Sequence, residues 1–302
     1  MELGLVGLGR MGMNMARRLL GGGHRGVVFN RSPGPVEEAR RYGAVGTASL
    51  AELAEQLTPP RVVWLMLPTG APTTQMLDAL LPLLQPGDLV VDGANAHYRD
   101  SQRRARELAA RGLRFVDAGV SGGVWGRELG YCLMVGGAPE DVQRLEPVLR
   151  TLAPPDGYAH VGPPGAGHFV KMVHNAVEYG MLQAIGEGFE LLHASEFPLD
   201  LRQIAHLWNQ GSVVRSWLME LAERAFAADP GLEGIRGYVE DTGYGRWTVQ
   251  DAVERAVPVP AIALALFARF RSRQEDPYGA KILALLRHEF GGHALRPEAA
   301  PE

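Results

Sequence analysis

Cysteine is the scarcest residue of this 302-residue chain, which contains only Cys132. A single cysteine excludes an internal disulfide bond and any metal site built from several cysteines. Cys132 lies in the apolar run of residues 131–135, where a thiol is usually buried and unreactive. We therefore expect a buried, inert thiol at this position and no nucleophilic role for it.

Long hydrophobic runs and an excess of one charge are also missing. The formal net charge is −4 and no Lys/Arg cluster forms a basic stripe, so we expect neither nucleic acid nor a membrane surface as a partner. The apolar runs are too short and interrupted for a bilayer-spanning helix. The first residues lack the basic region and cleavage site of a signal peptide, so we expect a cytoplasmic protein.

The first part of the chain alternates short Val- and Leu-rich runs with segments of helical spacing. Strands that alternate with helices predict an α/β domain with a doubly wound, mostly parallel sheet. A further pair of strands, near residues 131–136 and 158–161, closes this domain. The other expected strands are residues 3–6, 27–30, 62–67, 89–92 and 114–117, and the expected helices are residues 11–20, 36–42, 50–56, 73–84 and 101–111.

The pattern changes after the segment Gly162-Pro-Pro-Gly-Ala-Gly. From residue 169 onward the helical segments are long, and no strand is indicated. Pro and Gly residues of this kind end one architecture before another begins. We therefore expect two domains, an α/β domain over residues 1–163 and an all-α domain over residues 164–302.

A glycine-rich turn, Gly7-Leu-Gly9-Arg-Met-Gly12, follows the first expected strand and opens the first expected helix. In that context the glycines permit a tight turn and let the backbone approach a pyrophosphate at the helix N-terminus. A purely structural glycine-rich turn is the alternative. We predict that residues 1–163 form a Rossmann domain that binds a nicotinamide dinucleotide. The expected cofactor contacts are Gly7, Gly9, Arg10, Met11, Gly12, Asn30, Arg31, Ser32, Leu67 and Asn95.

The end of the second expected strand bears on the choice of cofactor. An NAD site usually has Asp or Glu there to bind the ribose hydroxyls, whereas this chain has Asn30-Arg31-Ser32. A neutral Asn does not repel a 2′-phosphate, Arg31 can pair with it, and Ser32 can donate a hydrogen bond. These residues favour NADP. The alternative is an NAD enzyme in which Arg31 is a solvated loop residue.

One face of the helix expected around residues 171–180 carries Lys171, His174, Asn175, Glu178 and Tyr179, while apolar or small residues fill the opposite arc. Lys171 and Glu178 are two turns apart, roughly 10 Å along the axis, so both can reach a short sugar acid. A lysine that acts as a base needs a lowered pKa, which partial burial can supply. The expected catalytic residues are Lys171 and Glu178. His168 and His174 are not spaced for a shared metal, so we predict no metal site.

Six further motifs are spread over almost the whole chain: Asp92-Gly-Ala-Asn95, Gly119-Val-Ser121-Gly122-Gly123, the helix of residues 171–179, Gly245-Arg246-Trp247-Thr248, Phe267-Ala-Arg269 and Arg287-His-Glu-Phe290-Gly-Gly-His293. Together they resemble the decarboxylating 6-phosphogluconate dehydrogenases, in a short form that lacks the extra helical repeat of longer members. The resemblance implies oxidation and decarboxylation of 6-phosphogluconate to ribulose 5-phosphate, in the pentose phosphate pathway, with proton transfers by Lys171 and Glu178. It also implies substrate contacts from Asn95, Ser121, Gly122, Gly123, His174, Asn175, Tyr179, Arg246, Thr248, Arg269, Arg287 and His293.

The resemblance further implies that the segment of Arg287 and His293 reaches the pocket of a neighbouring subunit, so we expect a homodimer or homotetramer. In a short-form chain this segment can instead fold back on its own pocket. Two other functions stay open. One is a non-decarboxylating β-hydroxyacid dehydrogenase, of the 3-hydroxyisobutyrate type, which does not need His174, Glu178, Arg287 and His293. The other is a catalytically silent NADP-binding protein, against which Lys171 and Glu178 argue.

Overall fold

The computed structural model describes residues 1–296, and the chain forms two compact units, Met1–Asn175 and Ala176–Glu302. The division between the units lies within one long helix, α8 (Ala166–His193). The first turns of α8 pack on the sheet of the first unit, which is why they belong to it. Among the described residues, no helix has the length and apolarity that a membrane crossing requires.

The first unit is built on an eight-stranded sheet in the order β3-β2-β1-β4-β5-β6-β7-β8. All neighbouring strands are parallel except β6 and β7, which confirms the doubly wound, mostly parallel sheet. The order reverses between β1 and β4, and open α/β sheets bind ligands at the carboxyl ends of strands beside such a reversal. The strands are β1 (Glu2–Val6), β2 (Arg25–Phe29), β3 (Val45–Gly46), β4 (Val62–Leu65), β5 (Leu89–Asp92), β6 (Arg114–Ser121), β7 (Cys132–Gly137) and β8 (Tyr158–Gly162).

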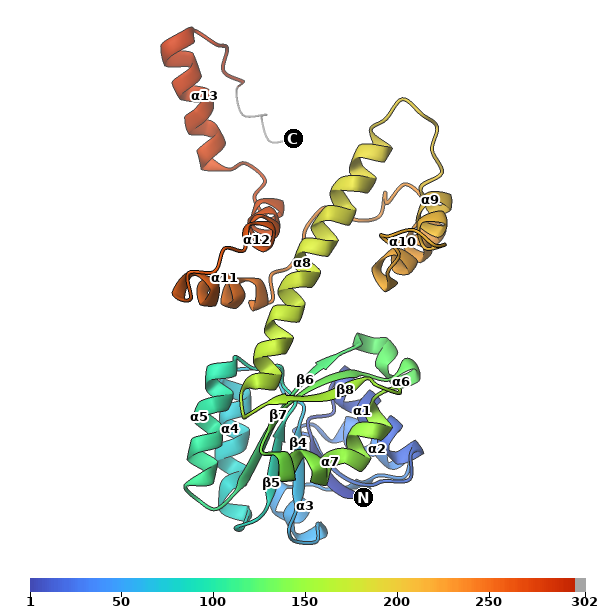
Figure 1. Cartoon of the computed structure of the whole chain (residues 1–302), viewed down its shortest axis with the longest axis vertical. Helices are drawn as coiled ribbons and strands as arrows, with labels where there is room; N and C mark the ends of the chain where they lie inside the picture. The colour runs from blue at the N-terminus through green and yellow to red at the C-terminus, as the bar shows by residue number, and fades with distance from the viewer. Residues whose placement is uncertain (297–302) are drawn as a thin grey trace. The chain divides into compact units, whose positions relative to one another are not determined.

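Helices cover both faces of this sheet (Figure 1). On one face α1, α2 and α7 bury residues such as Met15, Ala39 and Leu145, and on the other α3, α4 and α5 bury residues such as Leu53 and Leu80. The central strands therefore have apolar residues on both sides, as parallel sheets require. The helices are α1 (Arg10–Gly21), α2 (Pro33–Arg40), α3 (Leu50–Gln56), α4 (Ala71–Leu80), α5 (Tyr98–Ala109), α6 (Gly126–Leu129) and α7 (Pro139–Leu152), with short 3₁₀ turns η1 (Leu81–Leu83) and η2 (Gly123–Trp125).

Two details of the sequence prediction were wrong. The strand expected to end at Asp117 continues to Ser121, because antiparallel pairing with β7 extends it over residues that carry little strand signal of their own. Cys132 is exposed, because it is the first residue of β7 at the end of the ladder, and burial begins only at Leu133. The two-residue strand β3 was not predicted.

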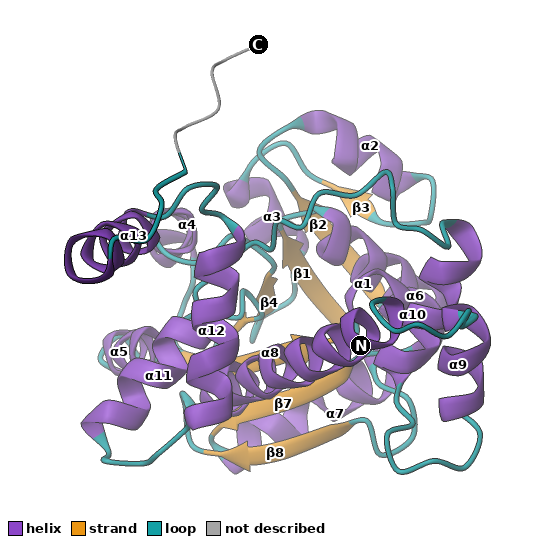
Figure 2. Cartoon of the chain, turned by 90° about the horizontal axis from the view of Figure 1, so that it is seen from above, coloured by secondary structure: helices purple, strands orange, loops and turns teal. Residues whose placement is uncertain are grey.

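The described part of the second unit contains only helices and loops, drawn in purple and teal in Figure 2, which confirms the predicted helical region. Phe189 near the end of α8 packs with α9 (Leu201–Trp208) and α10 (Trp217–Ala228) in one small core. Tyr179 of α8 packs with Ala265 and Leu266 of α12 (Pro260–Ser272) in another, beside α11 (Tyr244–Glu254). The last described helix, α13 (Tyr278–Gly291), buries none of its residues.

Candidate active site

The three glycines of the turn between β1 and α1 serve three different purposes. Gly7 has a φ of +95°, and a Cβ there would lie 2.4 Å from the carbonyl oxygen of Met66. A Cβ on Gly12 would lie 2.0 Å from the carbonyl oxygen of Gly7, so α1 could not approach the turn as closely. Gly9 has no chain atom within 4 Å of its would-be Cβ, and no side chain caps the first turn of α1. Its open side therefore leaves the helix N-terminus accessible to an anion.

Asn30 joins this turn to the end of β2. Its Oδ1 accepts a hydrogen bond from the backbone N–H of Leu8 at 2.9 Å, and its Nδ2 donates to Ser32 at 3.1 Å. A cavity of about 490 Å³ begins here, with Arg31 and Leu67 in its lining, and its other walls come from α3 and α4. Its volume lies in the range of nucleotide and small-ligand sites. Gly7, Asn30, Arg31, Ser32 and Leu67, all predicted cofactor residues, thus line one cavity beside the carboxyl ends of β1 and β2.

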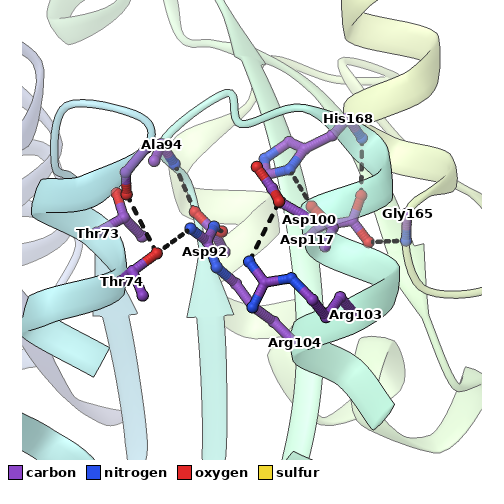
Figure 3. Close-up of polar contacts among 12 residues, drawn as sticks. Thr73, Thr74, Asp92, Ala94, Asp100, Arg103, Arg104, Asp117, Gly165 and His168 are labelled. Carbon is purple, nitrogen blue, oxygen red and sulfur yellow. Dashed lines mark hydrogen bonds and ion pairs between the residues drawn. The ribbon is translucent and has the colours of Figure 1, made fainter. Parts of the chain in front are cut away.

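Asn95 shapes the turn that carries the predicted Ser-Gly-Gly segment. It has a φ of +52°, and its side-chain amide exchanges hydrogen bonds of 2.8 and 3.1 Å with the backbone of Val120. The preceding turn is fixed by Asp92, which accepts from the Ala94 N–H at 3.0 Å and pairs with buried Arg104 at 2.7 Å (Figure 3). Because the Asn95 amide is occupied with Val120, in this structure it positions Ser121, Gly122 and Gly123, the last two of which have positive φ.

Lys171 lies at the start of α8 with only 5% of its surface exposed. Its Nζ lies 3.3 Å from Nδ1 of His174, and Nε2 of His174 lies 3.4 Å from Oγ of Ser121. The side-chain oxygen of Asn175 lies 3.1 Å from the same Nδ1. The structure thus brings four residues predicted from the sequence into one polar chain within the first unit. A buried amine next to an imidazole and a hydroxyl can exchange a proton with a substrate hydroxyl.

The second unit gathers another group of predicted residues around Tyr179. The guanidinium of Arg269 lies 3.4 Å from the centre of the Tyr179 ring, and its Nη1 donates to the carbonyl oxygen of Glu240 at 3.0 Å. Tyr179 also contacts Thr242 at 3.2 Å, and Arg246 pairs with Asp241. Burial raises the pKa of the Asp241 carboxyl, but the N–H of Gly243 and the guanidinium of Arg246 together hold this pKa below its ordinary value.

Glu178, Thr248, Arg287 and His293 are the other predicted residues of the second unit. Glu178 is half-buried, and its carboxylate has no hydrogen bond or ion pair within residues 1–296. Thr248 is buried and donates to the carbonyl oxygen of Tyr244 at 3.0 Å. Arg287 lies on exposed α13, and His293 follows it, so no described hydrogen bond or ion pair connects either with the Tyr179 group.

Two acidic residues at the site were not predicted. Asp117 on β6 is fully buried and accepts the N–H groups of Gly165 and His168, and Asp241 pairs with Arg246. Burial raises the pKa of Asp117, which the two N–H groups and His168 oppose. A signal existed for Asp117, because a charged residue inside an apolar strand is almost always there to accept a partner. No group of three possible metal-ligating side chains occurs among the described residues.

Comparison with known proteins now identifies both units. The description "NAD binding domain of 6-phosphogluconate dehydrogenase" matches residues 2–162, and "6-phosphogluconate dehydrogenase, C-terminal domain" matches residues 167–286. The chain is 45% identical over 297 residues to an NAD⁺-dependent, decarboxylating 6-phosphogluconate dehydrogenase of Haloferax volcanii, and 98% of each chain is covered. It is 44% identical over 298 residues to a putative 6-phosphogluconate dehydrogenase of Bacillus subtilis, covering 97% of this chain and 99% of the relative.

Two solved structures share the fold of this chain. The 6-phosphogluconate dehydrogenase of Plasmodium falciparum superposes with a TM-score of 0.84 at 27% identity, over 99% of this chain and 67% of that one. A 3-hydroxyisobutyrate dehydrogenase of Mycobacterium tuberculosis has a TM-score of 0.70 at 24% identity over 95% of this chain, which shows a shared fold. Because two family descriptions span the chain and two relatives match it over nearly their full lengths, the chain belongs to the 6-phosphogluconate dehydrogenase family, with the NAD-binding domain of that family in its first unit.

Proposed function

We propose that this chain oxidises and decarboxylates 6-phosphogluconate to ribulose 5-phosphate and CO₂, with NADP as the preferred oxidant. The observation that carries the proposal is the buried Lys171, joined to His174 and Ser121 in the unit that contains the NAD-binding domain. We place the enzyme in the cytoplasm, with residues 1–163 as the cofactor domain and residues 164–302 as the domain for substrate binding and oligomerisation.

Lys171 is assigned the role of the base. In its neutral form it takes the proton of the C3 hydroxyl while the hydride of C3 leaves. The nicotinamide, when bound, supplies the acceptor for that hydride. His174 holds the amine of Lys171 on one side and Ser121 on the other, so the amine has a fixed direction before the substrate arrives.

The loss of CO₂ follows from the chemistry of the oxidised substrate. A 3-keto acid carries its carboxylate β to a carbonyl, so the C1–C2 bond breaks and its electron pair forms an enediol. Protonated Lys171 can then donate a hydrogen bond to the carbonyl oxygen, where negative charge develops. Glu178 is assigned the role of the acid that protonates the enediol carbon. Its carboxylate has no described partner to compete with the substrate.

The phosphate and carboxylate of the substrate require cations. Arg269 is held by the carbonyl oxygen of Glu240 and the face of Tyr179, and Arg246 by Asp241, so both guanidinium groups are oriented within the second unit. Oriented guanidinium groups bind phosphate through paired hydrogen bonds. We assign Arg246 and Arg269 to the anionic ends of the substrate, with Tyr179 and Thr248 beside them.

A second copy of the chain is the proposed source of Arg287 and His293. Ile282, Leu286 and Phe290 follow one another at four-residue spacing on α13, and all three are exposed. A helix that leaves an apolar stripe uncovered in its own chain needs a partner surface. We infer a homo-oligomer in which α13 of one subunit borders the pocket of its neighbour.

This subunit sharing can be tested with two variants that are each inactive, Lys171→Met and Arg287→Ala. After the two proteins are unfolded and refolded together, hybrid oligomers should contain some pockets with both native residues. Activity should then reappear, at about a quarter of the wild-type value or less for a dimer. Hybrids that form and stay inactive would place both residues in the pocket of one chain.

The cofactor preference rests on Arg31 and Ser32, which lie at the cavity beside Asn30. Arg31 can pair with a 2′-phosphate, and Asn30 lacks the charge that would repel it. The relative from Haloferax volcanii is NAD⁺-dependent by name, whereas another relative, from Bacillus subtilis and 36% identical, is NADP⁺-dependent. Changing Asn30 to Asp and Arg31 to Ala should move the ratio of kcat/KM from NADP toward NAD. A wild-type ratio that already favours NAD refutes this preference.

The experiment that tests the function follows reduced cofactor and CO₂ together. With 6-phosphogluconate and NADP, the two products should appear in equal amounts. Reduced cofactor without CO₂ indicates a dehydrogenase that does not decarboxylate. No turnover of 6-phosphogluconate with either NADP or NAD refutes the proposed function.

A further inference from the structure

Strand β6 and helix α8 are held together at regular intervals. A Cβ on Gly119 of β6 would lie 2.5 Å from the Cβ of Lys171, so the backbone of the strand touches the base of the lysine side chain. Two residues later, Ser121 reaches His174. Two residues earlier, Asp117 reaches the first turn of α8. Alternate residues of a strand share one face, and the helix residues that they meet are about one turn apart.

Of the three strand residues, Asp117, Gly119 and Ser121, only Asp117 has an acidic side chain. Its two carboxylate oxygens accept the N–H of Gly165 at 2.6 Å and the N–H of His168 at 2.7 Å (Figure 3). The N–H of His168 belongs to the first turn of α8 and that of Gly165 to the residue just before the helix, where the N–H groups have no acceptor within the helix. The carboxylate is fully buried, so its hydrogen bonds are charge-assisted and poorly replaced by water.

His168 adds a second attachment. Its side chain is 1% exposed, and its Nδ1 lies 2.7 Å from Oγ of Ser101 on α5. Gly167 allows this close packing, because a Cβ there would lie 2.4 Å from the carbonyl oxygen of Met134. The first turn of α8 is therefore fixed to β6 through its backbone and to α5 through the His168 ring.

We propose that Asp117 is a positioning residue for the reaction, because it fixes the register of α8 on β6 that places the Lys171 amine between His174 and the substrate. The inference rests on the proposed role of Lys171 as the base. An error of about 1 Å in the position of a reacting group can lower a rate by about a hundredfold. Loss of the Asp117 carboxylate should therefore slow the chemical step and leave the cofactor turn of β1 and α1 unchanged.

The test is Asp117→Asn, which keeps the size of the side chain and removes one of its two acceptors. We expect kcat to fall by about ten- to a hundredfold, while KM for NADP stays within twofold. The primary isotope effect on kcat with substrate deuterated at C3 should increase, because hydride transfer becomes slower than the other steps. A protein that is merely less well folded would lose active molecules without a change in the isotope effect or in KM.

Asp88 provides a matched control. It is also fully buried and also accepts two backbone N–H groups, those of Arg61 at 2.6 Å and Gln85 at 3.0 Å, and it pairs in addition with the Arg61 guanidinium at 3.0 Å. It precedes β5, at the opposite end of that strand from Asp92 and the polar site. Asp88→Asn should lose stability as Asp117→Asn does and keep kcat and the isotope effect within twofold of wild type. If the two variants change kcat equally, or if Asp117→Asn keeps kcat and its isotope effect, the inference is overturned.

Hydrogen exchange separates this inference from the proposed function. Amide exchange in the peptide that covers residues 165–171 should be faster in Asp117→Asn than in wild type, and unchanged in Asp88→Asn, with no substrate or cofactor added. Equal exchange in all three proteins refutes the attachment itself. If wild type does not turn over 6-phosphogluconate, the proposed function fails, while exchange still decides whether Asp117 holds the start of α8.

Discussion

Replacing Gly9 and Gly12 in turn with alanine should separate cofactor binding from folding. A methyl group on Gly12 would lie 2.0 Å from the carbonyl oxygen of Gly7, so α1 must move by more than 1 Å relative to β1. Overpacking of this kind costs about 1–3 kcal/mol and sometimes more. A methyl group on Gly9 meets no chain atom within 4 Å, and the φ of −66° suits any residue. Alanine is a poorer N-cap than glycine, which destabilises the protein, but it also lowers the conformational entropy of the unfolded chain, which stabilises it. The two effects should cancel to within about 1 kcal/mol.

Gly12→Ala should therefore mainly lower stability, whereas Gly9→Ala should mainly weaken cofactor binding. In urea denaturation, Gly12→Ala should lower the free energy of unfolding by at least about 2 kcal/mol, and Gly9→Ala should change it by less than about 1 kcal/mol. In a fluorescence titration with NADPH, Gly9→Ala should weaken binding about tenfold or more, which corresponds to about 1.4 kcal/mol. If Gly9→Ala binds NADPH as tightly as wild type, its open side does not face the pyrophosphate, and our explanation of the glycine turn is wrong.

Three further predictions concern single residues. Lys171→Met should lower kcat for 6-phosphogluconate by at least about a thousandfold with the affinity for NADPH kept, and activity within tenfold of wild type would exclude the lysine as base. Burial raises the pKa of Tyr131 to about 12, so its phenol ionises more easily in the unfolded chain. Stability should thus decrease above pH 10, by about 2 kcal/mol near pH 12, and Tyr131→Phe should lack that part of the decrease in alkaline denaturation. Cys132 should react with a thiol reagent in the native protein, because it is exposed, and a thiol that reacts only after unfolding would contradict this.

The alternation of apolar runs was enough to predict the sheet, because its central strands are apolar on both faces and each is bounded by turn residues. It failed where an element depends on a partner strand. β3 consists of two residues, and only their pairing with Val27 and Val28 makes them a strand. The end of β6 contains Gly119 and Ser121, which have little strand preference, and it is extended by its pairing with β7.

The sequence pattern of α8 separates a polar face from an apolar one, but these two faces do not correspond to the exposed and buried sides of the helix. Lys171 and Tyr179 belong to the polar face, yet both are at most 5% exposed, whereas Val177 of the apolar arc is 48% exposed. The reason is that α8 packs against different partners along its length. Its first turns lie on the sheet of the first unit, and Tyr179 lies against α12 in the second. A single helical periodicity cannot describe two successive environments.

Buried aspartates show most clearly where prediction from the sequence ends. Asp88, Asp92 and Asp117 all lie in or beside apolar strands, and a carboxylate in such a place must accept hydrogen bonds from donors nearby. The sequence thus reveals that each needs a partner, but the partners lie 27, 12 and 48 residues away along the chain, at Arg61, Arg104 and Gly165. Of the three, only Asp117 also binds the helix of the proposed base, through the N–H of His168. All three buried carboxylates need hydrogen-bond donors, but the fold supplies these donors from different elements. The proposed role of Asp117 depends on donors at the start of α8, and the comparison of Asp117→Asn with Asp88→Asn measures that dependence.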